Sequence, residues 1–281
     1  MKRTKSEKIV IWIAFVLFLL YAVTLVYPLL WIIFNAFKTP GEFFNDPFGG
    51  ITEMQWVNFA NALKMEYRRT NLIEMFGNSL ILCIGCTFVS VFVPTMTAYV
   101  IAKYNFRGRN FIYSVAIATM LIPTVGSLAS LYGLMKDLNL LNRYIGIIIM
   151  SSSGFGFNFV MIYGFFRTIS WSYAEAAMID GADDFQIFTK VMIPQVMPSL
   201  VAIAIISLIN YWNDYFNPYM FLKSHPTVAV GLEKLMQQAE SQNEWPQLFA
   251  AITISIAPII VIFAAFQKTI MENTVAGGLK G

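Results

Sequence analysis

Residues 9–37 read IVIWIAFVLFLLYAVTLVYPLLWIIFNAF, a run of 29 residues without Asp, Glu, Lys or Arg. A hydrocarbon core of roughly 30 Å is crossed by about 20 residues of helix, so this run can span a bilayer. Lipid leaves backbone polar groups unsatisfied outside a helix or a closed barrel, and the alternation over about ten residues that barrel strands show is missing. Five more charge-free runs of at least 23 residues predict an all-α membrane protein of six helices: Met75–Ala102, Asn110–Met135, Tyr144–Phe166, Val191–Asn213 and Trp245–Gln267.

The composition excludes a soluble enzyme. Of the 281 residues, 57% are apolar and only 12% are charged, whereas soluble domains carry about 25% charged residues. The mean hydropathy is +0.62. The net charge of +3 is small and scattered, so no nucleic-acid partner is expected.

The N-terminus predicts an uncleaved anchor. Four basic residues precede the first run, as in a signal peptide, but the apolar stretch is about twice the usual length and no small-residue cleavage site follows. With the N-terminus in the cytoplasm, six spans return the C-terminus to the same side. This orientation places 11 of the 19 basic residues inside, as the positive-inside rule favours.

These runs divide the chain into alternating spans and loops. Trp56, Phe59, Ala60, Leu63 and Tyr67 recur at helical spacing and predict an amphipathic helix in the first outer loop. The expected order is a cytoplasmic N-terminus 1–8, span 9–37, outer loop 38–74, span 75–102, span 110–135, span 144–166, cytoplasmic loop 167–199, span 200–221, outer loop 222–244, span 245–267 and tail 268–281.

Two spans contain polar interruptions. The fourth carries Ser-Ser-Ser-Gly-Phe-Gly at 151–156, followed by Asn158, and the fifth becomes polar toward Asn210, Asn213 and Asp214. Ionisable residues at membrane depth are candidates for function, and interrupted helices often border a substrate site. The alternative is close packing between helices, which small and amide side chains also favour. The residues alone leave both readings open.

No cofactor, metal or catalytic site is expected on this chain. The sequence has no Gly-Lys dipeptide, and therefore no phosphate-binding loop of the GxxxxGK type. Transport driven by ATP would need an ATPase on another chain. Cys83 and Cys86 share a helix face, but zinc takes about four ligands and the one histidine, His225, lies in a distant loop. A membrane enzyme is unsupported because no His, Asp or Glu cluster borders the membrane.

The cytoplasmic loop carries the most specific pattern. It reads Glu-Ala-Ala-Met-Ile-Asp-Gly at 175–181, then eleven residues, then Ile193-Pro194. Gly181 can adopt a positive φ, which predicts two short helices with a sharp turn between them. Proline at 194 predicts a helix boundary or kink. Glu175 suits a helix start, and the small alanines allow a partner to approach closely.

This pattern resembles the "EAA" loop of the inner-membrane permeases of bacterial ABC importers. The family pattern is Glu-Ala-Ala, three residues, Gly, and later Ile-x-Leu-Pro; here Ile193 stands where the family has leucine. Further segments resemble carbohydrate-uptake permeases, in particular the maltose-permease "G" type subunit: Asn58–Leu63, Asn78–Leu80, Trp212–Asp214 with Pro218, and the terminus 276–281.

The resemblance implies a type I ABC importer permease fold in the bacterial cytoplasmic (inner) membrane, surrounded by lipid. It implies that the chain forms half of the path for an oligosaccharide or related sugar. The implied partners are a second homologous permease, two copies of an ABC ATPase that holds ATP and Mg, and an extracytoplasmic sugar-binding protein. The outer loop Lys223–Glu244 would face the binding protein, and the tail would face the ATPase pair.

The resemblance also assigns site residues. Those expected to couple the chain to the ATPase are Glu175, Ala176, Ala177, Asp180, Gly181, Ile193 and Pro194. Because sugar hydroxyls need hydrogen-bonding side chains, we expect the substrate path to be lined by Asn78, Asn158, Asn210, Asn213 and Asp214. Two alternatives remain open: an ABC permease for amino acids, phosphate or phosphonates, which shares the loop, and a secondary carrier built from inverted repeats, although no repeat relates the first and last three spans.

Overall fold

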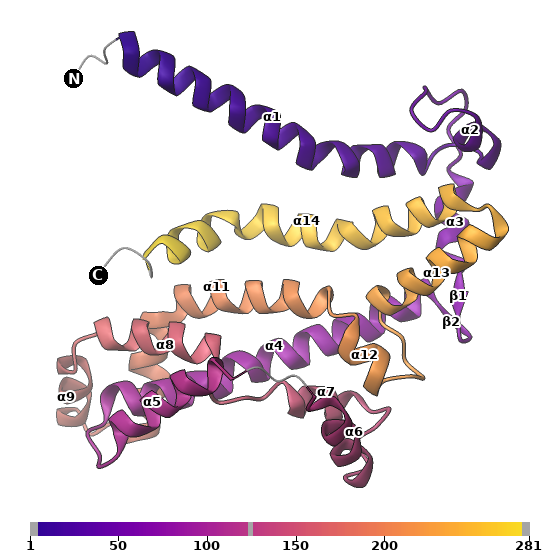
Figure 1. Ribbon diagram of the computed structural model, residues 1–281. Helices are drawn as coiled ribbons and strands as arrows, with labels where there is room; N and C mark the ends of the chain where they lie inside the picture. Colours follow the sequence, from indigo (N-terminus) through magenta and orange to yellow (C-terminus); the bar gives the residue numbers. More distant parts are fainter. Residues whose placement is uncertain (1–4, 123–125, 277–281) are drawn as a thin grey trace. The chain divides into compact units, whose positions relative to one another are not determined.

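The computed structural model describes residues 5–122 and 126–276, and most of this part of the chain is helical (Figure 1). The long helices are α1 (Lys5–Asn35), α4 (Leu72–Lys103), α11 (Ile193–Trp212) and α14 (Trp245–Ala276). The shorter helices are α2 (Pro40–Asn45), α3 (Val57–Lys64), α5 (Arg109–Met120), α6 (Leu128–Asp137), α7 (Tyr144–Met150), α8 (Phe157–Thr168), α9 (Ser172–Ile179), α10 (Asp184–Gln186), the π-helical η1 (Ile187–Met192), α12 (Phe216–Phe221) and α13 (Val228–Gln242). Two short antiparallel strands, β1 (Glu66–Tyr67) and β2 (Thr70–Asn71), form a hairpin.

Four helical stretches in the described residues are long and apolar enough to cross a membrane. They are Glu7–Asn35, Leu72–Lys103, Asp184–Trp212 and Trp245–Thr269. They overlap the first, second, fifth and sixth spans predicted from the sequence. The third and fourth predicted spans are instead each built from two shorter helices.

The third predicted span, 110–135, is divided between α5 and α6. The sequence between these helices contains Pro123 and Gly126. Proline has no backbone N–H and disfavours helical geometry in the residue before it. Gly126 has a φ of +89°, which a helix cannot contain. A single continuous helix over 110–135 is therefore incorrect.

The fourth predicted span, 144–166, is divided between α7 and α8, at the Ser-Gly interruption. Gly156 precedes α8 with a φ of +126°. Gly154 lies against α4, where a Cβ atom would come 3.2 Å from Cγ2 of Thr97. The absence of a side chain at Gly154 thus permits close contact between this break and α4.

The fifth predicted span begins earlier than expected and ends sooner. Residues 184–212 form one continuous helical stretch through α10, η1 and α11, so the second half of the predicted loop 167–199 belongs to it. Pro194 lies in the first turn of α11 but inside this continuous stretch, so its missing N–H removes one helical hydrogen bond. The wide turn of η1 precedes it, with Ile193 N–H donating to the Phe188 carbonyl. The helix ends at Trp212 rather than at 221.

Two compact units divide the described chain, and each has its own packing. The first contains the residues up to Ile73 together with Gly231–Ala257. Here Lys38 is fully buried and donates from Nζ to the Asp46 carbonyl at 2.9 Å. Asn58 Nδ2 donates to the carbonyls of Ala36 and Lys38.

The amphipathic helix expected in the first outer loop is α3, but its buried face differs from the expected one. The buried residues are Asn58 and Ala62, while Trp56 and Ala60 are exposed. Hydropathy periodicity missed this face because its central residue is polar: the Asn58 amide is buried to bind the chain that follows α1.

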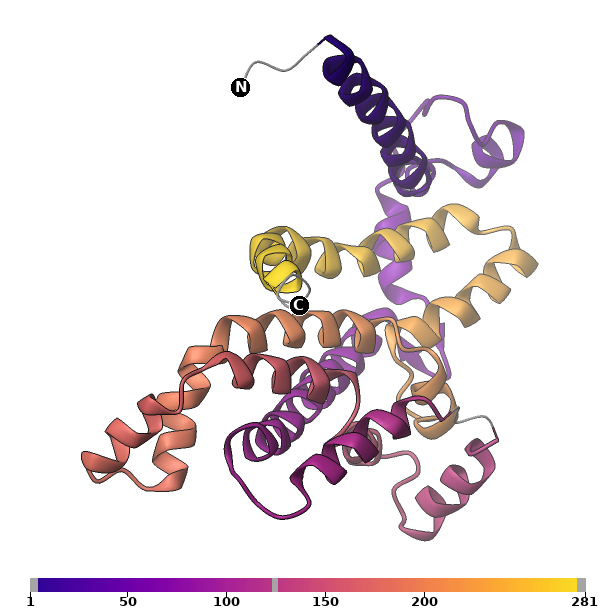
Figure 2. The same cartoon turned by 60° about the vertical axis from the view of Figure 1, so that its left-hand side comes forward.

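The second unit contains Glu74–Val230 and the segment from Pro258 onward. Its larger core lies among α4, α8, η1 and α11, where Phe159, Phe166, Ile187 and Met192 are fully buried. A second cluster joins α4, α6, α7 and α12. Within this unit, α9 lies at one end and α6 and α12 lie at the other, in both views (Figures 1 and 2).

Candidate functional site

The hairpin formed by α9, α10 and η1 carries the pattern that the sequence singled out. Helix α9 ends in a paired hydrogen-bond arrangement: the N–H of Ala182 donates to the Ala177 carbonyl, and the N–H of Gly181 donates to the Met178 carbonyl. Such C-terminal motifs require a left-handed residue, and Gly181 has a φ of +83°. Asp183 then accepts from the N–H of Gln186 at 2.7 Å and starts the next helix. The predicted turn at Gly181 is present, but it joins the short helix α9 to the continuous helical stretch 184–212 rather than to a second short helix.

The inner side of this hairpin is fixed to the core of the second unit. Ala174 is fully buried and Phe188 nearly so. The Tyr99 ring on α4 lies 4.9 Å from the Phe188 ring and 5.4 Å from the Phe166 ring. Aromatic contacts at these distances add to the free energy of burial. The hairpin therefore has a defined orientation relative to α4.

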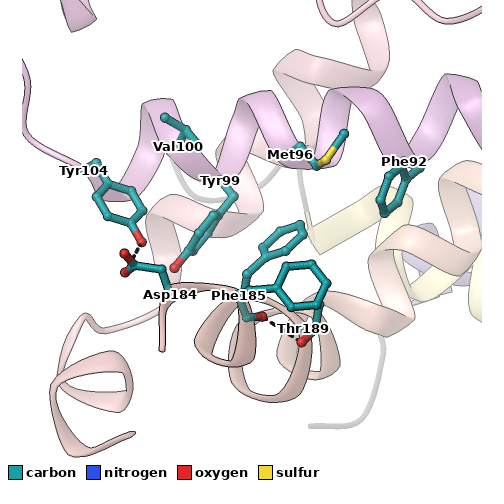
Figure 3. A pocket seen from close by; sticks show the side chains of 9 residues that line it. Phe92, Met96, Tyr99, Val100, Tyr104, Asp184, Phe185 and Thr189 are labelled. Atoms are coloured by element: carbon teal, nitrogen blue, oxygen red, sulfur yellow. Dashed lines mark hydrogen bonds between the residues drawn. The ribbon is translucent and has the colours of Figure 1, made fainter. Parts of the chain in front are cut away.

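Contacts at the C-terminal end of α4 attach both limbs of the hairpin. The first limb is α9 with the segment 169–171 that leads into it, and the second limb is α10 with η1. Lys103 Nζ donates to the Ile169 carbonyl on the first limb, and the Tyr104 ring lies 5.6 Å from that of Trp171. On the second limb, the Tyr104 hydroxyl donates to the Asp184 carboxylate at 2.9 Å (Figure 3). Partial burial, then the neighbouring Tyr99 hydroxyl and the Asp184 carboxylate, raise the pKa of Tyr104, so its proton stays in place for this bond.

Sequence reasoning missed Tyr104. The available signal was its position directly after Lys103 in the basic turn 103–109, which suggested only a cytoplasmic loop. Nothing in that turn points to Asp184, which is 80 residues away along the chain.

A groove of about 470 Å³ lies between α4 and the second limb of the hairpin (Figure 3). Its polar end holds Tyr104 and Asp184, and the remainder is mostly apolar. Its lining residues are Phe92, Met96, Tyr99, Val100, Tyr104, Asp184, Phe185, Phe188 and Thr189.

The outer side of the hairpin is exposed and apolar. Ile179 is 86% exposed and Met178 is 43% exposed, and both lie outside the stretches long enough to cross a membrane. Glu175 and Ala176 are also exposed, and Ala177 is half-buried. Large apolar residues exposed outside a membrane-spanning stretch indicate an interaction surface. We call the exposed residues Glu175, Met178, Ile179 and Asp180 the hairpin tip.

Ile193 and Pro194 lie away from the hairpin tip. They begin α11, where Ile193 is half-buried and packs against the core while Pro194 is exposed. The seven residues expected to couple the chain to an ATPase thus fall into two places: five on α9 and its turn, and two at the start of α11.

Two of the amides expected along a substrate path are bonded inside the chain. Asn158 Nδ2 donates to the Ser90 carbonyl at 2.9 Å and to Ser207 Oγ at 3.2 Å. Asn78 bonds both to the Pro226 carbonyl and to the Tyr144 hydroxyl. These contacts join helices, which is the packing role that the sequence left open.

The other three polar candidates lie together at the end of α11. Asn210 and Asn213 are exposed, and Asn213 Nδ2 donates back to the Ile209 carbonyl at 2.8 Å. Asp214 accepts at Oδ1 from the Asn217 N–H and at Oδ2 from the Asn217 side-chain amide. The Asp214 carboxylate thereby shapes the turn from α11 into α12.

Both cysteines are buried in α4, each 1% exposed, and neither is in a disulfide. In the part of the chain that the structure describes, no group of three or more His, Cys, Asp or Glu side chains could hold a metal ion.

The family assignment follows from the sequence of this same region. Residues 90–271, which contain the hairpin and α11, match the family described as "Binding-protein-dependent transport system inner membrane component". The chain belongs to this family. It is therefore a multi-pass inner-membrane permease component and a transport subunit, as the EAA pattern predicted.

Relatives of this permease share nearly its whole length. It is 30% identical to the diacetylchitobiose uptake system permease protein NgcG of Streptomyces coelicolor, over 94% of this chain and 87% of that one. It is 29% identical to the arabinooligosaccharides transport system permease protein AraQ of Halalkalibacterium halodurans, over the full length of both.

A solved structure confirms the predicted all-α type I importer fold. The crystal structure of a bacterial ABC transporter involved in the import of the acidic polysaccharide alginate matches this permease with a TM-score of 0.80 and 25% identity. The match covers 95% of this chain and 99% of the other. The terminal segment 277–281, part of the predicted sugar-permease signature, lies outside the described residues.

Proposed function

We propose that this permease is half of the translocation path of an ATP-driven importer for an oligosaccharide or a related sugar. The observation that carries the proposal is the hairpin tip, an exposed surface of apolar and acidic side chains on a hairpin whose other side is fixed to α4. Chemical energy must come from elsewhere, because the sequence has no phosphate-binding loop. A rigid hairpin presenting apolar side chains outside a span suits docking on an ATPase.

The sugar substrate is supported by what related proteins transport. Two relatives are named for diacetylchitobiose and arabinooligosaccharides, and the similar structure belongs to an alginate importer. All three substrates are carbohydrates with several hydroxyl groups. Such a substrate needs hydrogen-bonding side chains along its path, and we assign this role first to Asn210, Asn213 and Asp214. Asn78 and Asn158 remain candidates, although their amides already bond within the chain.

The proposed assembly has four other protein chains and a fixed orientation. One is a second, homologous permease; two are copies of an ABC ATPase that binds ATP and Mg; and one is an extracytoplasmic sugar-binding protein, in keeping with the family description. The hairpin and both termini lie in the cytoplasm. Glu175, Ala176, Ala177, Asp180 and Gly181 contact the ATPase, while Ile193 and Pro194 direct the hairpin into α11.

The experiment that tests this proposal is the intact mass of the complex purified gently from its native membrane. We expect one copy of this chain, one different permease and two identical ATPase chains. ATP-dependent uptake by the reconstituted complex is then measured with labelled chito-, arabino- and alginate oligosaccharides and the binding protein.

Two outcomes would contradict the proposal. This chain alone, or paired only with itself without an ATPase, would indicate a secondary carrier. A complete complex that imports amino acids or phosphate but no oligosaccharide would support the ATP-driven importer and refute the sugar substrate.

A further inference from the structure

Asn78 lies near the N-terminal end of α4, and its side-chain amide both donates and accepts a hydrogen bond. Its Nδ2 donates to the Pro226 carbonyl at 2.9 Å, and its Oδ1 accepts from the Tyr144 hydroxyl at 2.7 Å. One amide thus joins α4 to α7 and to the chain that leads into α13. Few side chains other than Asn or Gln can donate and accept in this way.

The next residue of α4 adds a second bond to the same chain. The N–H of Val228 donates to Ser79 Oγ at 2.9 Å, and Ser79 is only 1% exposed. A buried N–H without a partner would cost about 1–3 kcal/mol. The beginning of the predicted outer loop 222–244 is therefore fixed to α4.

Asn142 fixes an earlier part of the same segment through bonds to Phe221 and Ser224. Its N–H donates to the Phe221 carbonyl, its Oδ1 accepts from the Ser224 N–H, and its Nδ2 donates to Ser224 Oγ, at 2.7, 2.7 and 2.8 Å. Its φ of +61° is one that Asn adopts more readily than most residues. Residues 221–228, which we call the loop base, are thus bonded at several points.

The other end of α4 bonds the coupling hairpin through Lys103 and Tyr104. Between Asn78 and Lys103 the helix is continuous, which corresponds to about 38 Å at 1.5 Å per residue. Pro94 removes one backbone bond within α4, but this region is braced from the side: Thr97 Oγ1 donates to the Gly154 carbonyl at 2.6 Å, and Asn158 bonds the Ser90 carbonyl.

We propose that α4 connects the loop base mechanically to the coupling hairpin, and that Asn78 and Ser79 are the positioning residues at its outer end. A displacement of the hairpin moves the end of α4 that carries Tyr104. Because the helix is continuous and braced, the motion reaches Asn78 and changes the bonds to Pro226 and Val228. Coupling of this kind is reciprocal, so a partner at the outer loop acts on the hairpin in return. This inference rests on the proposed function.

The test measures hydrogen exchange in the purified native complex, with and without Mg²⁺ and the non-hydrolysable analogue adenylyl imidodiphosphate. In the wild type, nucleotide should change hydrogen exchange at two places: in the hairpin, residues 172–192, and in the loop base. A coupling of 1–3 kcal/mol corresponds to a change of about 5- to 150-fold. In Asn78→Leu the hairpin should still respond, while the response of the loop base should fall below about twofold.

Matched variants separate coupling from simple loss of structure. Asn110→Leu, at an exposed position on α5, should keep both responses. Tyr144→Phe removes one of the two Asn78 bonds and should give an intermediate response. If Asn78→Leu does not assemble, Ser79→Ala removes a single acceptor and should still reduce the response of the loop base to nucleotide. If a substitution changed only the exchange rate in the absence of nucleotide, it would have loosened the structure locally, and the proposal would be overturned.

Two negative results have different meanings. A wild-type hairpin that does not respond to nucleotide would refute the proposed function. A hairpin that responds while the loop base does not, or a full response of the loop base in both Asn78→Leu and Ser79→Ala, would refute the role of α4 and leave the proposed function standing.

Discussion

Gly181 shows how one residue determines the geometry of the hairpin formed by α9, α10 and η1. Its φ of +83° closes α9, and no atom lies near the position of an added Cβ, so the constraint is on backbone conformation rather than on space. A β-branched residue in this conformation costs at least about 1–2 kcal/mol. We predict that Gly181→Val reduces uptake below about a tenth of wild type while the protein remains in the membrane, measured by oligosaccharide uptake and immunoblotting.

The matched control is Gly181→Asn. Asparagine tolerates the left-handed conformation better than other side chains, so this variant should retain most of the uptake. Normal uptake by the valine variant would show that the turn geometry is unimportant for coupling.

Asp214 allows a second prediction for a single side chain. Both of its carboxylate oxygens accept from Asn217, so its role in the turn must be separated from its charge. We predict that Asp214→Ala lowers the maximal uptake rate or the sugar imported per ATP, whereas Asn217→Ala has a smaller effect. Equal losses in both variants would assign Asp214 to the turn alone.

At the scale of elements, the hairpin tip should bind the ATPase through its apolar side chains. We predict that Ile179→Asp lowers the amount of ATPase that co-purifies with the permease by at least about tenfold, because interface anchors often contribute 2 kcal/mol or more. Phe48→Asp is the control, since Phe48 is 73% exposed and lies in the predicted outer loop, away from the hairpin tip. Equal ATPase recovery with both variants would place the contact elsewhere.

The short helix α2 carries a capping box that gives a pH prediction. Thr39 N–H and Oγ1 both reach Glu42, and the Glu42 N–H donates back to Thr39 Oγ1. The backbone bond from Thr39 lowers the pKa of Glu42 below its ordinary value of 4.5. A lowered pKa stabilises the folded form above the ordinary value, and this stabilisation is lost as the pH falls through the lowered one.

We therefore expect the α2 amides to lose protection from hydrogen exchange, after correction for intrinsic rates, between about pH 5 and pH 3. Glu42→Gln should remove this pH dependence. Unchanged protection of the wild type across that pH range would show that the capping box of Thr39 and Glu42 does not stabilise α2.

How far sequence predicts this molecule differs between its elements. Charge-free runs located α1, α4 and α14 well, because lipid imposes a minimum apolar length. The same runs failed to show the break between α5 and α6, since Pro123 and Gly126 are as uncharged as their neighbours. At the hairpin, local pattern predicted the Gly181 turn, but the Tyr104–Asp184 bond depends on tertiary packing over 80 residues. For the same reason the sequence could not show that Asn78 and Asn158 bond within the chain, because an amide can hydrogen-bond a sugar hydroxyl or a neighbouring helix equally well.

At the scale of the whole molecule, the predicted orientation can be tested with thiol reagents. Cys83 and Cys86 are each 1% exposed, so they should give a low background. We predict that Ser241→Cys in the predicted outer loop reacts with an impermeant maleimide added to intact cells or spheroplasts. Lys190→Cys, on η1 of the hairpin, should react only after the membrane is opened. Labelling of Lys190→Cys from outside would show that the true orientation is the reverse of the predicted one.

The bare surface of α1 has a consequence for handling the purified permease. None of the side chains in its most apolar stretch is buried within the chain, so in solution that surface must be coated by amphiphile. A permease isolated by itself should therefore carry more detergent per polypeptide than the same permease in its complex. The difference, read from light scattering and refractive index, would report how much of α1 is shielded by neighbouring subunits in the membrane.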